Sequence, residues 1–360
     1  MGKPTDETPS TSSPMGTRLP LLTRTLTKAQ NVAPRRRRAE TETEAQLEFD
    51  DDDLDVIQVE DEDDDTHEED DAKDIKAPPK LRSVGSTTSE GSTGHKNEDR
   101  FVVRSGPHFH LLAVMDGHGG YKAADFVAER LYQTLETVFR DGGLEFISSE
   151  MEKAVEALDR KFLTIADRME DDSGACFNAV VLYWSRTEQT YQKLVLNCGD
   201  CRSVAREAPE RVSNRASWRT KEDRTGNTAT IIPLSDDHSA ANRSEKLRVL
   251  EAGAFIRNRR IAGILEPFRS IGDLDLKGAN MRGWVIPTPE IRASELLVGR
   301  TTIVVATDGV WSVLSNQRVM TLAHLELTDG GDSQTAAEAI ADEAREMGST
   351  DDITVLVVQV

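Results

Sequence analysis

This chain has few cysteines and lacks both long apolar runs and an apolar N-terminal segment. Each of these absences excludes a class of protein. The three cysteines, Cys176, Cys198 and Cys201, are too few and odd in number for a secreted disulfide scaffold and suit a reducing compartment. No stretch is long and apolar enough to cross a bilayer, and the N-terminus lacks the apolar core of a signal peptide. We expect an intracellular protein, cytoplasmic or nuclear or both, with no membrane and no nucleic-acid partner.

Acidic residues are abundant but unevenly spread. Residues 1–80 hold 22 acidic and 11 basic side chains, a net charge of −11, whereas residues 81–360 carry the other −9 of the total of −20. Residues 40–71 contain 19 Asp and Glu and neither Lys nor Arg. Because like charges repel and little apolar surface offsets the cost of ordering, we predict that residues 1–80 form a disordered tail.

Two charged segments of this tail are candidates for binding. The four arginines at residues 35–38 are compatible with a nuclear import signal or a docking site, and equally with a solvated cluster that has no function. The acidic segment at residues 40–71 supports the hypothesis that the chain is a scaffold that binds basic proteins.

Residues 81–360 have the patterning of a globular domain. Amphipathic segments predict helices, and short apolar runs predict strands. The predicted helices are residues 121–139, 149–169, 239–252, 315–325 and 332–347, and the predicted strands are 101–103, 109–115, 180–184, 194–197, 202–204, 303–306 and 353–358. Because several strands follow one another through short turns and helices come in pairs, we predict an α+β fold with antiparallel sheets covered by helices.

Two local signals refine this prediction. Ser149 is followed three residues later by Glu152, the spacing of a capping box, so we expect the second helix to begin at Ser149. The tight turn at Gly199 and Asp200 predicts a hairpin that joins the strands at 194–197 and 202–204.

The most informative motif is the run from Asp116 to Gly120, directly after the apolar stretch 111–115. It is either an ordinary tight turn or a place where a buried strand delivers a carboxylate and a histidine to a functional site. Three more segments place an Asp beside a turn at a strand boundary: residues 97–99, 307–309 and 351–352. If these strands are neighbours, their carboxylates converge and cannot all ionise without a cation. Oxygen ligands of this kind suit Mg²⁺ or Mn²⁺.

Seven segments, in order, resemble the metal-dependent serine/threonine protein phosphatases of the protein phosphatase 2C (PPM) family. They are residues 97–99 (NED), 114–120 (VMDGHGG), 197–204 (NCGDCRSV), 234–238 (LSDDH), 269–273 (RSIGD), 306–311 (ATDGVW) and 351–355 (DDITV). The resemblance covers residues 81–360. It implies an αββα four-layer sandwich, two antiparallel β-sheets flanked by pairs of helices, with two Mg²⁺ or Mn²⁺ ions at one end of the sheets.

The resemblance also assigns roles to single residues. The implied metal ligands are strand-end carboxylates and one backbone carbonyl: Glu98, Asp99, Asp116, Gly117, Asp308 and Asp351. Asp116 resembles the ligand that bridges both ions, and His118 matches the general acid. A third, weaker site in some members would use Asp171, with Asp172 as a competing choice.

The implied reaction is hydrolysis of phosphoserine and phosphothreonine in proteins. A water activated by two metal ions attacks phosphorus in line, no phosphoenzyme forms, and His118 protonates the leaving oxygen. The expected partners are phosphorylated proteins, and we expect a monomer.

The chain departs from the family pattern at the substrate phosphate. Gly94 stands where many relatives carry an arginine that binds this group, and Lys96 or Arg100 is the substitute that we consider, although lysine lacks the bidentate fork of arginine. Asp352 replaces a common Asn, and Ser312 a common Asp. No presumed ligand of the two-metal centre is lost, but Gly94 keeps an alternative open: a catalytically weak pseudophosphatase that acts as a binding or regulatory protein.

Two further features have competing interpretations. Residues 205–232 form a basic insertion that either steers phosphorylated substrates or is a solvated loop. The CxxC spacing of Cys198 and Cys201 raises a zinc or redox site, but the chain has no second ligand pair and the motif does not open a helix. We therefore expect no metal or redox role for these cysteines, and we expect His67 and His238 to be hydrogen-bonding or surface residues.

Overall fold

The computed structural model describes residues 76–92, 94–209 and 229–360. The predicted tail, apart from residues 76–80, lies outside the described residues, together with its charged segments, His67 and most of the basic insertion. Within the described part of the chain, none of the helices combines the length and the apolar character needed to span a bilayer.

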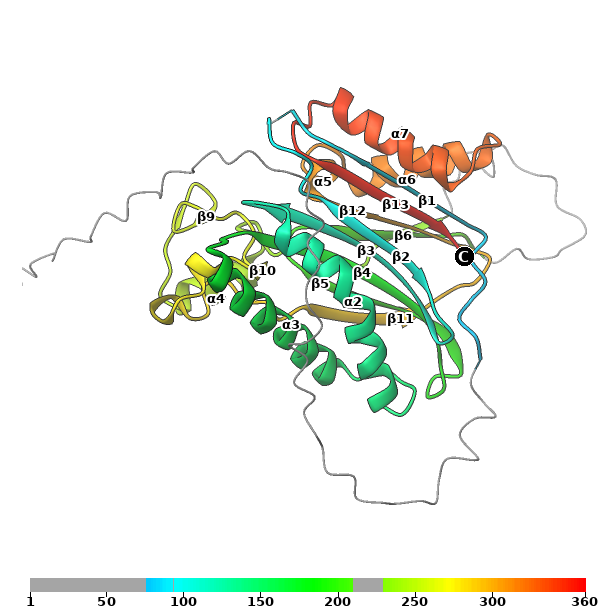
Figure 1. Cartoon of the computed structure of the whole chain (residues 1–360). Coiled ribbons are helices and arrows are strands. Elements are labelled where there is room, and N and C mark those ends of the chain that lie inside the picture. Colours follow the sequence, from blue (N-terminus) through cyan, green and yellow to red (C-terminus); the bar gives the residue numbers. More distant parts are fainter. Residues whose placement is uncertain (1–75, 93, 210–228) are drawn as a thin grey trace, which may run out of the picture. The chain divides into compact units, whose positions relative to one another are not determined.

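Two antiparallel sheets form the centre of the domain (Figure 1). The first sheet has the strand order β1-β13-β12-β6-β7, and the second has the order β11-β5-β4-β3-β2, with β10 paired to β4. In chain order the strands are β1 (Ser83–Ser89), β2 (Arg100–Ser105), β3 (Phe109–His118), β4 (Gly174–Ser185), β5 (Thr190–Cys198), β6 (Arg202–Glu207), β7 (Thr230–Pro233), β10 (Ile271–Gly272), β11 (Glu290–Glu295), β12 (Thr301–Ala306) and β13 (Ile353–Gln359).

Each sheet carries a pair of helices on its outer face (Figure 1). The second sheet is covered by α2 (Lys122–Asp141) and α3 (Ser148–Met169), and the first by α6 (Asn316–Thr328) and α7 (Ser333–Glu346). This arrangement confirms the predicted αββα sandwich. Because both faces of each sheet are covered, the central strands are apolar along almost their whole length, and eleven of the twelve residues of β4 are buried.

The hydrophobic core between the sheets fixes how they stack. Leu112 and Val180 of one sheet belong to the same buried cluster as Val305 and Leu356 of the other. A second cluster lies between the first sheet and α6 and α7, where small residues such as Ala337 let the helices approach closely. The ends of β3, β12 and β13 are thereby held in fixed positions relative to one another.

The predicted hairpin at Gly199 and Asp200 is wrong. Strand β5 pairs with β4 and β11 in one sheet, whereas β6 pairs with β12 and β7 in the other, so the turn passes from one sheet to the next. Gly199 has φ +114°, and a Cβ there would lie 2.2 Å from Sγ of Cys176. Sequence spacing alone cannot distinguish this crossing from a hairpin, because both need a tight glycine turn.

The helix starts also differ in detail from the predictions. Helix α3 begins at Ser148, its N-cap is Ile147, and no side chain caps it, so the predicted capping box at Ser149 is wrong. A capping box does form at the start of α7, between Asp332 and Thr335. Helix α4 (Arg243–Glu251) begins four residues later than predicted, where the Asn242 side chain accepts the backbone N–H groups of the first turn.

A small lobe covers one end of the second sheet. It contains α4, the short strands β8 (Ile256–Arg257) and β9 (Arg260–Ile261), and the 3-10 helices η4 (Leu274–Leu276) and η5 (Ala279–Met281). Its own apolar cluster includes Val249, Ile261 and Phe268. Apart from α4 the sequence patterns do not predict this lobe, and they also miss β1, β7 and β11.

We predict that Leu112→Ala lowers the free energy of unfolding by about 2–5 kcal/mol, because Leu112 is fully buried between the sheets and its loss leaves a cavity. The matched control is Leu250→Ala, the same change at a side chain that is 44% exposed on α4, which we expect to alter stability by less than about 0.5 kcal/mol. Urea unfolding followed by circular dichroism measures both. Equal losses for the two variants would contradict the placement of the core.

Candidate metal centre

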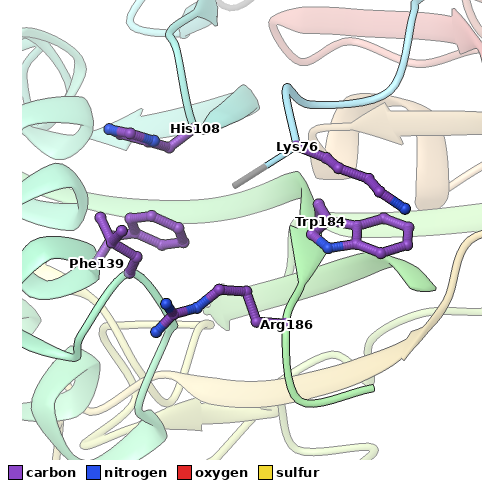
Figure 2. Close-up of a pocket in the computed structure, with 6 residues that line it drawn as sticks. Lys76, His108, Phe139, Trp184 and Arg186 are labelled. Atoms are coloured by element: carbon purple, nitrogen blue, oxygen red, sulfur yellow. The ribbon is translucent and has the colours of Figure 1, made fainter. Parts of the chain in front are cut away.

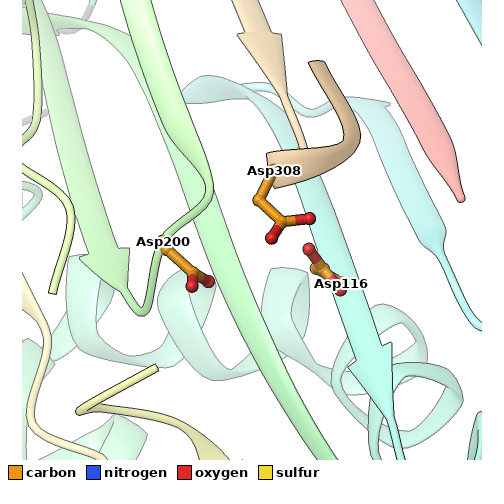
Figure 3. Close-up of side chains that lie close together, drawn as sticks. All are labelled: Asp116, Asp200 and Asp308. Carbon is orange, nitrogen blue, oxygen red and sulfur yellow. The ribbon is translucent and has the colours of Figure 1, made fainter. Parts of the chain in front are cut away.

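Three carboxylates meet at one end of the sandwich (Figure 3). Asp116 lies near the end of β3, Asp200 in the turn between β5 and β6, and Asp308 at the start of α5 (Asp308–Trp311), directly after β12. Each offers an oxygen within 4.8 Å of the oxygens of the other two. Since β3 and β12 belong to different sheets, the carboxylates converge between the two sheets rather than along the edge of one.

The environment of these carboxylates disfavours three bare negative charges. Burial, together with the charge of neighbouring aspartates, raises the pKa of Asp116 and of Asp308 well above the ordinary value. Burial likewise raises the pKa of Asp200 to about 6 and that of Asp99 to about 7. A cation would relieve this repulsion, and the all-oxygen donor set fits a hard divalent ion such as Mg²⁺ or Mn²⁺.

Asp99 and Asp351, two of the predicted ligands, lie beside this group. Asp99 is buried, and its Oδ2 accepts a hydrogen bond of 2.9 Å from Oγ1 of Thr307. Asp351 is exposed at the surface, and its negative charge contributes to the raised pKa of both Asp116 and Asp308. The structure therefore brings Asp99, Asp116, Asp308 and Asp351 to one end of the sheets.

Glu98 is positioned by its backbone. Its N–H donates to Oδ2 of Asp352 at 2.6 Å, and Oδ1 of the same carboxylate accepts the N–H of Gly91 at 2.7 Å. A Cβ at Gly117 would lie 2.4 Å from the carbonyl oxygen of Glu98, so glycine allows the two backbones to touch. Asp352, to which the sequence patterns assign no role, thus holds the loop that carries Glu98 against the end of β3.

His118 ends β3 and faces a carboxylate from another segment. Its Nε2 lies 2.9 Å from Oδ1 and 3.0 Å from Oδ2 of Asp273. Burial by itself would lower the pKa of His118, but the adjacent Asp273 carboxylate outweighs burial and raises it. Burial would raise the pKa of Asp273, and the imidazolium of His118 instead holds it below the ordinary value.

Three other predicted site residues have polar partners or an exposed position. Asp171 forms an ion pair of 3.1 Å with Nζ of Lys122 and caps Ser173, and it is not part of the three-carboxylate group. The guanidinium of Arg100 bonds to the Asp125 carboxylate and to backbone carbonyls of the loop before β2. Lys96 is exposed in that loop.

Sequence reasoning missed the roles of three aspartates: Asp200, Asp273 and Asp352. Asp200 and Asp273 are in segments that match the family, and Asp352 was noted only as a departure from it. A signal was present, because each is an acidic residue next to a turn or strand end. Only proximity in space distinguishes Asp200, which joins the cluster, from Asp273 and Asp352, which accept N–H groups.

The remaining candidates of the sequence analysis are structural. Cys176, Cys198 and Cys201 are buried free thiols, and the turn of the CxxC segment lies between two sheets. The Nδ1 atom of His238 accepts the N–H of Gly199 at 3.1 Å, and burial lowers the pKa of this histidine to about 3. His238 is therefore a neutral hydrogen-bonding residue that fixes the turn bearing Asp200.

One hollow lies beside the Asp200 turn, and another lies near the start of β3, at the other end of that strand from Asp116. A groove of about 420 Å³ begins next to the Asp200 turn and is lined mostly by polar residues: Arg202, Pro233, Ser235, Asp236, Asp237, Ser239, Ala241, Asn242 and Asn316. A second hollow of about 10 Å³, room for a single water, is lined by Lys76, His108, Phe139, Leu144, Trp184 and Arg186 (Figure 2). None of the predicted site residues lines the second hollow.

Comparison with known proteins identifies the family of this chain. The sequence model of the family described as Protein phosphatase 2C matches residues 79–353. The chain is 34% identical over 223 residues to Probable protein phosphatase 2C 14 of Arabidopsis thaliana, an alignment that covers 60% of this chain and 42% of the relative. It is 29% identical over 294 residues to Protein phosphatase 1L of Bos taurus, with 78% and 73% covered.

A solved structure shares the fold. The crystal structure of a phosphatase from a pathogenic strain of Toxoplasma gondii superposes with a TM-score of 0.62 at 21% identity, and covers 79% of this chain and 94% of the other. The chain spans 62% of the length of Probable protein phosphatase 2C 11 of Arabidopsis thaliana, to which it is 31% identical over 73% of its own length. The family match, which extends over most of the described domain, shows that the chain belongs to the protein phosphatase 2C family.

Proposed function

We propose that this protein is a metal-dependent protein phosphatase that hydrolyses phosphoserine and phosphothreonine in protein substrates. The observation that carries the proposal is the convergence of Asp116, Asp200 and Asp308 from two sheets in a family of phosphatases. The mutual repulsion of these carboxylates destabilises the fold. A bound cation would offset this repulsion, which supports a role of the group in metal binding.

These residues would hold two divalent ions. Asp116 would be a ligand of both, Asp308 and Asp351 would bind the first ion, and Glu98 with the Gly117 carbonyl would bind the second. When bound, the ions supply Lewis acidity that lowers the pKa of a water and offsets the charge of the phosphate. Asp99 and Asp200, buried next to these ligands, would accept hydrogen bonds from water and fix its direction.

His118 would act on the leaving group. As the bond between phosphorus and the serine or threonine oxygen breaks, the imidazolium of His118 gives its proton to that oxygen and becomes neutral imidazole. The raised pKa of His118 supports this role, since the charged form is the proton donor.

The loop before β2 would receive the substrate phosphate. Gly94, which replaces the usual arginine, has φ +85°, a backbone conformation that side chains with a Cβ rarely adopt. The donors of Arg100 already bond to Asp125 and to the loop backbone. The exposed Lys96 is then the better placed of the two predicted substitutes.

The groove beside Asp200 supports a polypeptide substrate. It is open and lined mostly by polar residues, and Arg202 in its lining is held by Asp237 and Asn316. A chain on either side of a phosphorylated residue could lie there and make backbone hydrogen bonds.

We predict that Asp308→Asn reduces Mn²⁺-dependent phosphate release from a phosphoserine peptide by about 100-fold or more, because it removes a ligand and a charge from the centre. Malachite-green release of phosphate, with Mn²⁺ and with EDTA, measures this. The control is Asp329→Asn, the same change at an exposed residue after α6.

Stability provides a readout of the same variant that is independent of activity. In EDTA, Asp308→Asn should raise the melting temperature because it relieves repulsion among buried carboxylates, whereas Mn²⁺ should stabilise the wild type more than the variant. A wild type that neither releases phosphate nor is stabilised with Mg²⁺ or Mn²⁺ would instead favour the pseudophosphatase.

We predict that His118→Ala slows turnover of a phosphoserine peptide by about 10²–10⁴-fold, since a serine alkoxide needs a proton to leave. The decrease in kcat with p-nitrophenyl phosphate should be much smaller, because its leaving group is stable without a proton. Steady-state kcat on both substrates gives the ratio, with His324→Ala on α6 as the control. An equal loss on the two substrates would exclude the acid role.

We predict that Lys96→Ala raises KM for a phosphopeptide by about 10-fold with little change in kcat, as expected when ground-state and transition-state binding are lost together. Arg100→Ala should instead lower the melting temperature, because it leaves Asp125 and the loop carbonyls without their donor. Kinetics and thermal melts of both variants separate the two roles. A normal KM for Lys96→Ala would remove Lys96 from the phosphate site.

A further inference from the structure

We propose that Asp273 is a positioning residue for His118, which fixes the imidazole so that Nδ1 is the atom that gives the proton to the leaving oxygen. The inference rests on the proposed role of His118 as the acid and adds which nitrogen acts and what orients it.

The hydrogen bond between the two residues sets the tautomer. Both carboxylate oxygens of Asp273 lie within 3.0 Å of Nε2 of His118. An ionised carboxylate can only accept, so Nε2 must carry a hydrogen in every protonation state that keeps this contact. Among the described residues, none bonds to Nδ1, and 27% of the His118 side chain is accessible, against 5% for Asp273. The side of the ring with Nδ1 is therefore the one available to substrate.

The strand register places the pair. His118 on β3 is opposite Gly174 on β4, and Gly174 is opposite Gly272 on β10, directly before Asp273. A Cβ at Gly174 would lie 2.3 Å from Nε2 of His118 and 2.4 Å from Oδ2 of Asp273. The pair thus occupies the space that glycine leaves on the central strand, and a larger residue there would displace it.

Local backbone bonds hold Asp273 in an unusual conformation. It has φ +56° and ψ +53°, the left-handed region that a non-glycine residue adopts only with support. Its N–H donates to the carbonyl of Ser173 at 3.1 Å, and the hydroxyl of Ser270 donates to its carboxylate. Backbone strain that is maintained at Asp273 by these bonds indicates that the orientation of its side chain is important for function.

A buried ion pair between Asp159 and Lys277 holds the turn that carries Asp273. Oδ1 of Asp159 on α3 accepts both the N–H of Gly272 and Nζ of Lys277, each at 2.8 Å. The Lys277 ammonium also donates to the carbonyl of Ser270 at 2.8 Å. Ion pairs this deeply buried contribute little net stability but fix geometry when all their bonds are satisfied. Here they fix the turn that presents Asp273.

The proton balance assigns no proton to Asp273. During cleavage the electron pair of the P–O bond passes to the serine or threonine oxygen, which takes the proton from Nδ1. His118 is left neutral with its hydrogen on Nε2, still bonded to Asp273, and solvent returns the lost proton to Nδ1.

The decisive variant is Asp273→Asn, which keeps the shape and tolerates the left-handed backbone. We expect phosphoserine-peptide kcat to fall by about 10-fold or more, bounded by the ~10²–10⁴-fold of the acid itself, with a much smaller loss on p-nitrophenyl phosphate. In a His118→Ala background the same change should cost nothing further, because the two residues act as one unit. Asp275→Asn, an exposed aspartate two residues away, is the matched control.

Nitrogen-15 NMR of His118 identifies its tautomer independently of enzymatic activity. We expect hydrogen on Nε2 in the wild type and a mixed population in Asp273→Asn. Gly174→Ala is a second variant that should give the same kinetic pattern by displacing the pair.

Three results would overturn the inference: equal losses of Asp273→Asn on both substrates, a further loss in the His118→Ala background, or a wild-type hydrogen on Nδ1 alone in the neutral ring. Failure of the proposed function has a different signature, because a wild type that lacks Mn²⁺-dependent phosphate release would still report the tautomer by NMR.

Discussion

Repulsion among closely spaced, half-buried carboxylates is the constraint on which the rest of the site depends. Asp116, Asp200 and Asp308 approach within 4.8 Å in surroundings dry enough to raise the pKa of each. Such a group would spread apart if it stood on a flexible loop. It stays together because the strand that carries Asp116 and the strand that precedes Asp308 belong to two sheets that are locked by a shared apolar core. The stability of the sandwich therefore holds together carboxylates that repel one another.

The other acidic residues near the centre have the opposite character. Asp352 accepts two backbone N–H groups, and Asp273 accepts from an imidazole and a hydroxyl, so their charges are compensated within the protein. Charge-assisted bonds of this kind are short and directional. The charges of one group of aspartates repel one another, while those of the second group contact the Glu98 loop and His118. The two groups cannot be told apart by residue type or by spacing.

Sequence patterns predicted the elements better than their connections. The apolar runs in β3, β12 and β13 and the amphipathic stretches of α2, α3 and α7 identified elements that the structure contains. The hairpin at Gly199 failed because a tight turn has the same residues whether the chain returns to its own sheet or crosses to another. The small lobe around α4 was mostly missed, since its strands are two residues long and too short for a periodic signal.

The sequence by itself determined that acidic residues stand at the ends of apolar strands, and its seven ordered segments indicated the family that the comparisons then showed. Only the tertiary structure decided which of these acidic residues lie close together. It brings Asp200 into the group and pairs Asp171 with Lys122 instead, although the sequence resemblance implied Asp171 and not Asp200 as a ligand. It also sets Asp273 against His118, 155 residues earlier in the chain. The physical reason is that these distances follow from strand register and from the stacking of two sheets, which depend on packing across the whole core and not on local spacing.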